Sequence, residues 1–214
     1  MRLWRRAAKA LPVATLPIVG AVAEASAYTL HTLHDFCSQA SCADGSAPLG
    51  ALVADSAGNL YGTAVKGGAD GHGTVFELLK KSETDHRYRV LYSFCQKTNC
   101  ADGDQPASTL ILDTAGNLYG TTVVGGAGHG LVFELSTGAR PRLQVLQAFC
   151  RQTGCADGDI PGAPLTYAGA DTGALYDGVS PLYGTTNAGG AHHNGAVFQL
   201  TSVPGQRRRS ETVL

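Results

Sequence analysis

Histidines in glycine-rich segments are the side chains of this sequence best suited to chemistry. His72 and His129 each stand four residues before the phenylalanine of a Phe-x-Leu motif. His193 lies in a third such segment, where Asn194 takes the equivalent position. Imidazole binds metal ions and transfers protons, so these residues would form a site if their loops met at one axis. We favour the simpler interpretation that they belong to three solvated polar loops.

Aspartates form the second candidate set. The sequence Cys-Ala-Asp-Gly occurs three times, and a further aspartate follows it in two copies, whereas the first copy has Ser46. The candidate metal-binding carboxylates are therefore Asp102, Asp104, Asp157 and Asp159. Short oxygen-rich loops bind calcium, but the full calcium-loop spacing is absent, and Asp and Gly are ordinary turn residues. We interpret these segments as turns and assign neither a metal nor any other cofactor.

The cysteines fall into three pairs with the same spacing in each. The pairs are Cys37 and Cys42, Cys95 and Cys100, and Cys150 and Cys155. The repetition favours one local disulfide in each copy, worth about 2 kcal/mol in the chain-entropy model. The alternative is metal thiolate ligation, although zinc sites typically use the tighter Cys-x2-Cys spacing. Disulfides are the expected state in an oxidising compartment.

The cysteine pairs recur because the whole sequence is built from a repeated unit. The motif Gly-Asn-Leu-Tyr-Gly-Thr and its degraded third copy, Pro-Leu-Tyr-Gly-Thr-Thr, occupy residues 58–63, 116–121 and 181–186. Self-similarity of this kind indicates a repeat architecture, and we place the repeats at about residues 28–80, 86–137 and 142–201. The tyrosines of the motif, Tyr61, Tyr119 and Tyr183, are candidates for carbohydrate binding. We favour a role in packing between sheets.

Each repeat contains four short segments of strand character. In the middle repeat they are residues 89–94, 108–112, 117–123 and 131–135, and in the first repeat the series begins at residues 32–36. Turn residues separate these segments and none has helical periodicity, which predicts an all-β fold of three tandem four-stranded antiparallel sheets. Apolar residues on both faces of the strands predict that each sheet has neighbours on both sides, as in a β-propeller.

The ordered landmarks of the repeat resemble a known family. The run Gly-Asn-Leu-Tyr-Gly-Thr-Thr, followed by Gly-Gly, Val-Phe-x-Leu and Val-Leu-Tyr-Ser-Phe, is similar to the GloVer tandem repeat of exported bacterial proteins. The resemblance covers nearly all of the chain after the leader. It implies a propeller-like fold and an extracellular or surface location, and it brings no established activity and no catalytic residues. The third copy departs from the pattern, with Pro181 in place of the asparagine.

The N-terminal segment has the features of a secretory signal peptide at residues 1–27. A basic start is followed by an apolar run and by the small residues of 25–27, which suit a cleavage site. The remaining chain has 12 basic and 16 acidic residues, because the leader holds four of the 16 basic and one of the 17 acidic residues. This net charge of −4 argues against nucleic-acid binding. We expect a three-repeat β domain at 28–203, a polar basic tail at 204–214, and no membrane contact after cleavage.

The sequence therefore predicts a secreted, periplasmic or cell-surface protein, stapled by disulfides, that acts as a non-enzymatic binding or interaction module. The alternatives are a propeller-type extracellular enzyme, a lyase or hydrolase, with the histidine loops at its centre, and a carbohydrate-binding module. Propellers typically use roughly 4–8 blades, so three repeats suggest a partial ring or one completed by an oligomer. The expected partners are a second copy of the chain, forming a homodimer, or a surface polymer.

Overall fold

The structure, a computed structural model, describes residues 29–202 and 209–213. The expected signal peptide at 1–27 lies outside these residues, as do residue 203 of the expected β domain and residues 204–208 and 214 of the expected tail. The chain separates into a unit of residues 1–31 and a compact unit of residues 32–214, and the description below concerns the second unit. In the described part of the chain, no helix is long and apolar enough to cross a membrane.

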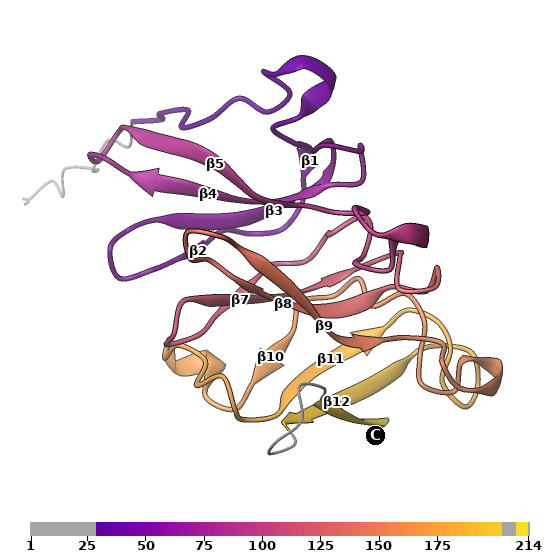
Figure 1. The fold of residues 1–214 in the computed structure, drawn as a ribbon. Helices are drawn as coiled ribbons and strands as arrows, with labels where there is room; N and C mark the ends of the chain where they lie inside the picture. The colour runs from indigo at the N-terminus through magenta and orange to yellow at the C-terminus, as the bar shows by residue number, and fades with distance from the viewer. Residues whose placement is uncertain (1–28, 203–208, 214) are drawn as a thin grey trace, which may run out of the picture. The chain divides into compact units, whose positions relative to one another are not determined.

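The described residues of this unit form three antiparallel sheets that follow one another in chain order (Figure 1). The first contains β1 (Ser46–Pro48), β2 (Val53–Ala54), β3 (Leu60–Lys66), β4 (Thr74–Lys80) and β5 (His86–Ser93). The second contains β6 (Ile111–Leu112), β7 (Asn117–Thr122), β8 (Leu131–Ser136) and β9 (Arg142–Ala148). The third contains β10 (Thr166–Tyr167), β11 (Leu182–Thr186), β12 (Ala196–Ser202) and β13 (Arg209–Val213). The prediction of an all-β fold with three tandem antiparallel sheets is confirmed, and closure into a ring stays a prediction.

The sheets are offset from the sequence repeats by one strand. We expected residues 89–94 to open the second repeat, but β5 pairs with β4 and completes the first sheet. The cause is the short polar connection after β4, which closes a hairpin through the bond from Lys81 N to Asp85 O, 2.9 Å long. Sequential strands joined by a short turn pair with each other, whereas the cysteine loop separates β5 from the strand that follows it.

Two further predictions are corrected by this offset. Residues 32–36 form no strand, and the sheets of the described residues do not include them. Residues 209–213, expected to lie in a polar tail, form β13 and pair with β12 from Phe198 to Ser202. Each sheet therefore takes its outer strand from the segment that follows its own repeat.

The core lies between the sheets, and alternate residues of the middle sheet supply its two halves. Leu118 and Phe133 pack with Val75 and Phe94 of the first-sheet segment in one cluster. Tyr119, the neighbour of Leu118, points to the other face and packs in a second cluster with residues of the third sheet. The period-2 alternation of strand side chains thus produces two apolar faces, and the predicted packing on both sides of a sheet is observed for the middle sheet.

The glycine of the repeated motif leaves room for an aromatic ring of the neighbouring strand. A Cβ added at Gly120 would lie 2.8 Å from both Phe133 Cζ and Leu110 Cδ2. Gly62 and Gly184 meet the equivalent rings of Phe76 and Phe198. A glycine within a strand often marks such a close approach, and here it lets the phenylalanine ring of the neighbouring strand lie across the motif strand.

Candidate functional site

The repeated motif follows a turn whose aspartate accepts hydrogen bonds from both the backbone and the side chains of the motif. Asp113 Oδ1 accepts hydrogen bonds from the backbone N–H groups of Ala115 and Asn117, at 2.9 and 2.7 Å. Asp113 Oδ2 accepts bonds from Asn117 Nδ2 and the Tyr119 hydroxyl, at 2.9 and 3.0 Å. The same pattern recurs around Asp55 in the first sheet. The asparagine and tyrosine of the motif are therefore the two side chains that fix this turn to its strand.

These bonds set the ionisation of the turn residues. Burial alone would raise the pKa of Asp55, but hydrogen bonds from Asn59 and Tyr61 outweigh it and hold the pKa below its usual value. Burial and the hydrogen bond to Asp55 both raise the pKa of the Tyr61 hydroxyl. At neutral pH the turn thus joins a carboxylate to a neutral phenol, which is the charge state that the hydrogen bonds require.

The motif tyrosines proposed as carbohydrate platforms occupy different environments. Tyr61 and Tyr119 are buried between sheets, so their rings present no open face to a sugar. Tyr183 is half-buried on the third sheet. The turn aspartate of this copy is Asp177, which accepts hydrogen bonds from Val179 N, Ser180 N and Ser180 Oγ, and Pro181 replaces the asparagine. Packing is the role that the structure gives to the first two.

Each cysteine pair forms a local disulfide, Cys37–Cys42, Cys95–Cys100 and Cys150–Cys155. In each disulfide loop, the carboxylate of the Cys-Ala-Asp-Gly aspartate accepts hydrogen bonds from backbone N–H groups of the loop. Asp102 is buried and accepts bonds from the backbone N–H groups of Gln96 and Lys97, at 3.0 and 3.1 Å, and from the Tyr92 hydroxyl at 2.6 Å. Asp44 and Asp157 make the matching backbone bonds in the other loops.

The loop around Asp44, the first of these aspartates, stabilises the ionised form of its carboxyl group. Burial would raise the pKa of Asp44, but bonds from the Ser38 hydroxyl and backbone and from the Gln39 backbone outweigh it, so the pKa lies below its usual value. The carboxylates of Asp102 and Asp157 are likewise occupied by loop donors. These two calcium candidates of the sequence accept hydrogen bonds from the backbone of their own loops, as turn residues do.

The second aspartate of the loop pairs with a histidine of the preceding repeat. Asp104 Oδ1 lies 3.0 Å from His72 Nδ1, and Asp159 Oδ1 lies 3.1 Å from His129 Nδ1. Backbone bonds accompany both pairs, since the carbonyl oxygens of His72 and His129 accept from Gln105 N and Ile160 N. Each His–Asp pair therefore joins the β3–β4 or β7–β8 loop to the cysteine loop that leads into the next sheet.

The alternative in which the three histidines meet at one axis is not seen in the described residues. His72 and His129 belong to two different groups of close donor atoms, each with its own cysteine pair, and His193 belongs to neither. His193 lies exposed on the β11–β12 loop. The three histidines thus lie on three separate loops, and the arrangement provides no shared acid–base centre.

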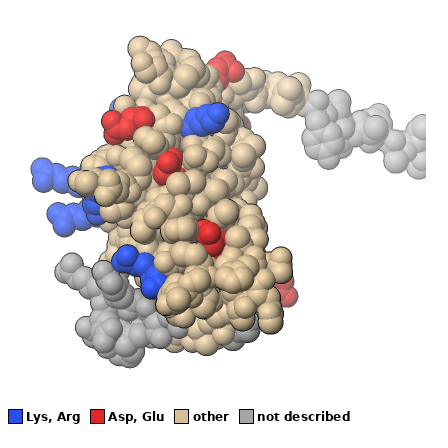
Figure 2. All heavy atoms as spheres, turned by 90° about the vertical axis from the view of Figure 1, so that its right-hand side faces the viewer, with Lys and Arg blue, Asp and Glu red and all other residues tan. Residues whose placement is uncertain are grey.

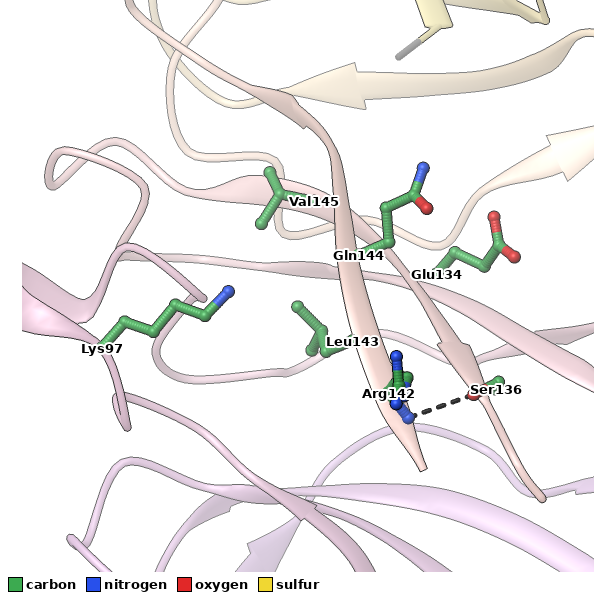
Figure 3. Close-up of a pocket in the computed structure, with 7 residues that line it drawn as sticks. All are labelled: Lys97, Glu134, Ser136, Arg142, Leu143, Gln144 and Val145. Atoms are coloured by element: carbon green, nitrogen blue, oxygen red, sulfur yellow. Dashed lines mark hydrogen bonds between the residues drawn. The ribbon is translucent and has the colours of Figure 1, made fainter. Parts of the chain in front are cut away.

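A groove that the sequence did not indicate runs along the outer strand of the second sheet (Figure 3). Its volume is about 510 Å³, and its lining consists of Lys97, Glu134, Ser136, Arg142, Leu143, Gln144 and Val145. Figure 3 shows Lys97 extending toward Leu143, with Gln144 on the opposite side of the strand. The groove lies along β9, the last strand in the order of the second sheet.

The first sheet has a smaller groove at the equivalent edge, of about 250 Å³. It is lined by Glu77, Leu79, Arg87 and Arg89, and Arg89 Nη2 lies 2.7 Å from Glu77 Oε2. On the face drawn in Figure 2, basic and acidic residues form small separate groups of both signs. Among the residues that Figure 2 draws in colour, these groups do not join into a continuous basic patch.

The fold and these loops define a class: an all-β repeat protein in which local disulfides staple the loop before each motif. The chain matches the family model described as the Gloeobacter/Verrucomicrobia repeat over residues 19–181, and it belongs to this family. The resemblance inferred from the repeated motif is thereby confirmed. Comparison with curated proteins and with solved structures finds no match.

Proposed function

We propose that this chain is an exported, disulfide-stapled repeat module that acts by binding, and that its terminal sheets bind a second copy of the chain. The observation that carries the proposal is a contrast between repeat-equivalent positions. Residues that are buried at the two internal junctions are exposed on the outer faces of the first and third sheets.

The outer face of the first sheet shows the contrast at its second strand segment. Leu52 is 48% exposed, whereas its equivalents Leu110 and Leu165, which face the neighbouring sheet, are 3% and 6% exposed. A shallow apolar depression of about 380 Å³ lies beside it. Its lining includes Leu33, Phe36, Pro48, Leu52, Phe76 and Leu78. The side chains that receive a neighbouring sheet elsewhere in the chain are thus present here without one.

The outer face of the third sheet shows the complementary contrast. Val197 is 48% exposed, whereas its equivalents Val75 and Val132 are fully buried against the following sheet. Tyr183 lies beside Val197 on the same face, since Thr185 pairs with Val197 and Tyr183 with Gln199 in the register of β11 and β12. This is the face that, in the first and second sheets, packs against the next repeat.

A second copy fits both faces because the two faces are the halves of the internal junction. The third sheet of one copy would meet the first sheet of the other, and two such contacts would close a ring of six sheets, within the usual propeller range of roughly 4–8 blades. Burial of the exposed apolar area would contribute about 25 cal/mol per Å². Disulfide staples and the signal-like leader support action outside the cytoplasm.

Light scattering of the oxidised protein at micromolar concentration tests this partner. The expected mass is that of two chains, and Val197→Glu or Leu52→Glu should reduce it to one, because a charge would be buried in each contact. Val179→Glu is the matched control, since Val179 is also exposed but lies in the loop before β11. A one-chain mass for the unchanged protein, or a two-chain mass for Val197→Glu, would overturn the proposed partner.

A further inference from the structure

Two clusters in this chain place a histidine against a cysteine pair. A ring nitrogen of His72 and the sulfurs of Cys95 and Cys100 lie within 4.8 Å of one another. His129, Cys150 and Cys155 repeat the arrangement at the next junction. All six residues are half-buried. In the described residues, the remaining pair, Cys37–Cys42, belongs to no such cluster.

The aspartate of each His–Asp pair holds Nδ1 of its histidine, so that the lone pair of Nε2 is left to bind a metal ion. His129 Nδ1 hydrogen-bonds Asp159 Oδ1, which fixes the proton on Nδ1 and leaves the lone pair on Nε2. His72 Nδ1 lies 3.0 Å from Asp104 Oδ1, a buried oxygen that has no aligned hydrogen bond. Metal-binding histidines almost always donate their other ring N–H to a carboxylate, a backbone carbonyl or water, and these pairs show the first of these.

The second aspartate of the cysteine loop occurs only in the two loops that contact a histidine. Asp104 and Asp159 occur in the two cysteine loops that a histidine loop contacts, whereas the first loop, which has no histidine in its cluster, carries Ser46. A general requirement for turn formation would place the aspartate in all three loops. The presence of the second aspartate therefore goes with a histidine contact and not with the disulfide itself.

We propose that, when its disulfides are reduced, the chain binds two zinc-class divalent cations. Each cation is held by one Cys-x4-Cys pair and the adjacent histidine, with Asp104 or Asp159 as the positioning residue. Two cysteines and one histidine are an established zinc donor set with a fourth position left for water. Disulfide and metal site are alternative states of the same sulfurs, so the oxidised protein does not bind the ion.

The chemistry balances with a phosphine as reductant. The phosphine takes up an oxygen atom from water and is oxidised to its oxide, the S–S bond breaks, and the two cysteines gain the two hydrogens of that water. Zn²⁺ then displaces the two thiol protons, which are released to solvent, and two thiolates neutralise its charge.

Cobalt titration of the full chain after phosphine reduction tests the site, because thiolate-bound Co²⁺ shows charge-transfer absorption. We expect two ions per chain in the reduced protein and none in the oxidised protein. His72→Ala should leave one ion, with the site at His129 serving as an internal control for folding. Replacement of Cys37 and Cys42 by serine should leave two ions.

Asp159→Asn separates positioning from folding, because it should weaken one of the two sites about 10- to 100-fold and leave the other unchanged. A reduced chain without thiolate–cobalt absorption would overturn the proposal. Three equivalent ions per chain would also overturn it, since a cysteine pair alone would then be enough to bind an ion. Binding of two ions by His72→Ala would overturn it for the same reason.

Discussion

At the scale of single residues, the motif owes its pattern to one aspartate. Asn59 donates to Asp55 through Nδ2 and accepts a bond from Lys80 N through Oδ1, so it joins the turn to the next strand. Tyr61 reaches the same aspartate through its hydroxyl and fills the inter-sheet core with its ring. Asparagine, tyrosine and the turn aspartate thus recur together because each satisfies the others. The third copy, which lacks the asparagine, uses different contacts.

Removal of a motif tyrosine hydroxyl should therefore lower the free energy of unfolding only where that hydroxyl donates to an aspartate. Tyr119→Phe deprives the buried Asp113 of a donor and should lower the free energy of unfolding by about 1–3 kcal/mol. Tyr183→Phe is the control, and it should change the free energy by less than about 0.5 kcal/mol. Urea unfolding with an unchanged m-value measures both, and equal losses in the two variants would contradict this account of the motif.

The turn aspartates also make stability depend on pH in the acid range. The pKa of Asp55 in the folded chain is below its usual value of 3.8, so its contribution is fully present above that pH. It is lost as the pH falls through the lower folded pKa, since protonation then removes the acceptor. We expect Asp55→Asn to be less stable than the unchanged chain at neutral pH and to lose less stability on acidification. Parallel unfolding curves at pH 7 and pH 3 with the same difference in both proteins would contradict this.

At the scale of elements, each sheet is assembled from one repeat and the strand that follows it. The polar connection after β4 closes a hairpin, and β5 therefore belongs to the sheet before the cysteine loop. The loop then carries the chain to the next sheet, where its second aspartate meets the histidine of the previous one. Because of this offset, every cysteine loop between sheets contacts both, and the staples lie at the junctions.

The glycine of the motif is the element-scale feature most sensitive to substitution. Gly120→Ala would place a Cβ 2.8 Å from Phe133 Cζ and from Leu110 Cδ2, and should cost about 1–3 kcal/mol by overpacking. Gly138→Ala is the matched control, because no heavy atom lies within 4 Å of a Cβ there. Its effect should be within about 0.5 kcal/mol. Chemical denaturation compares the two, and equal stabilities would show that the ring does not lie against the glycine.

The strands could be predicted from the sequence, but their partners could not. Turn residues and alternating apolar positions located β7 and β8, because both signals are local. The repeat period leaves its own starting point undetermined, so the sequence alone does not show that residues 89–93 complete the first sheet. The residues of β13 follow a basic run and carry no apolar alternation that would distinguish them from a tail. The pair of His72 and Asp104 spans two repeats, and its only sequence signal is that the second aspartate is absent from the first loop.

At the scale of the whole molecule, the repeats are joined by inter-sheet cores and stapled at their loops. Each disulfide closes a short loop and contributes about 2 kcal/mol in the chain-entropy model. Three such contributions suit a protein that works outside the cytoplasm, where thiols are oxidised. The exposed junction residues Leu52 and Val197 mark where further repeats of the same kind would pack.

The central claim is that the chain is exported and stapled, and one intact-mass measurement tests both parts. The protein would be recovered from the periplasm or medium of an expressing bacterium and weighed before and after reduction. We predict a chain that begins at or near Tyr28 and that gains the mass of six hydrogens on reduction, one for each cysteine. A chain that still begins at Met1, or a mass that reduction leaves unchanged, would contradict the account.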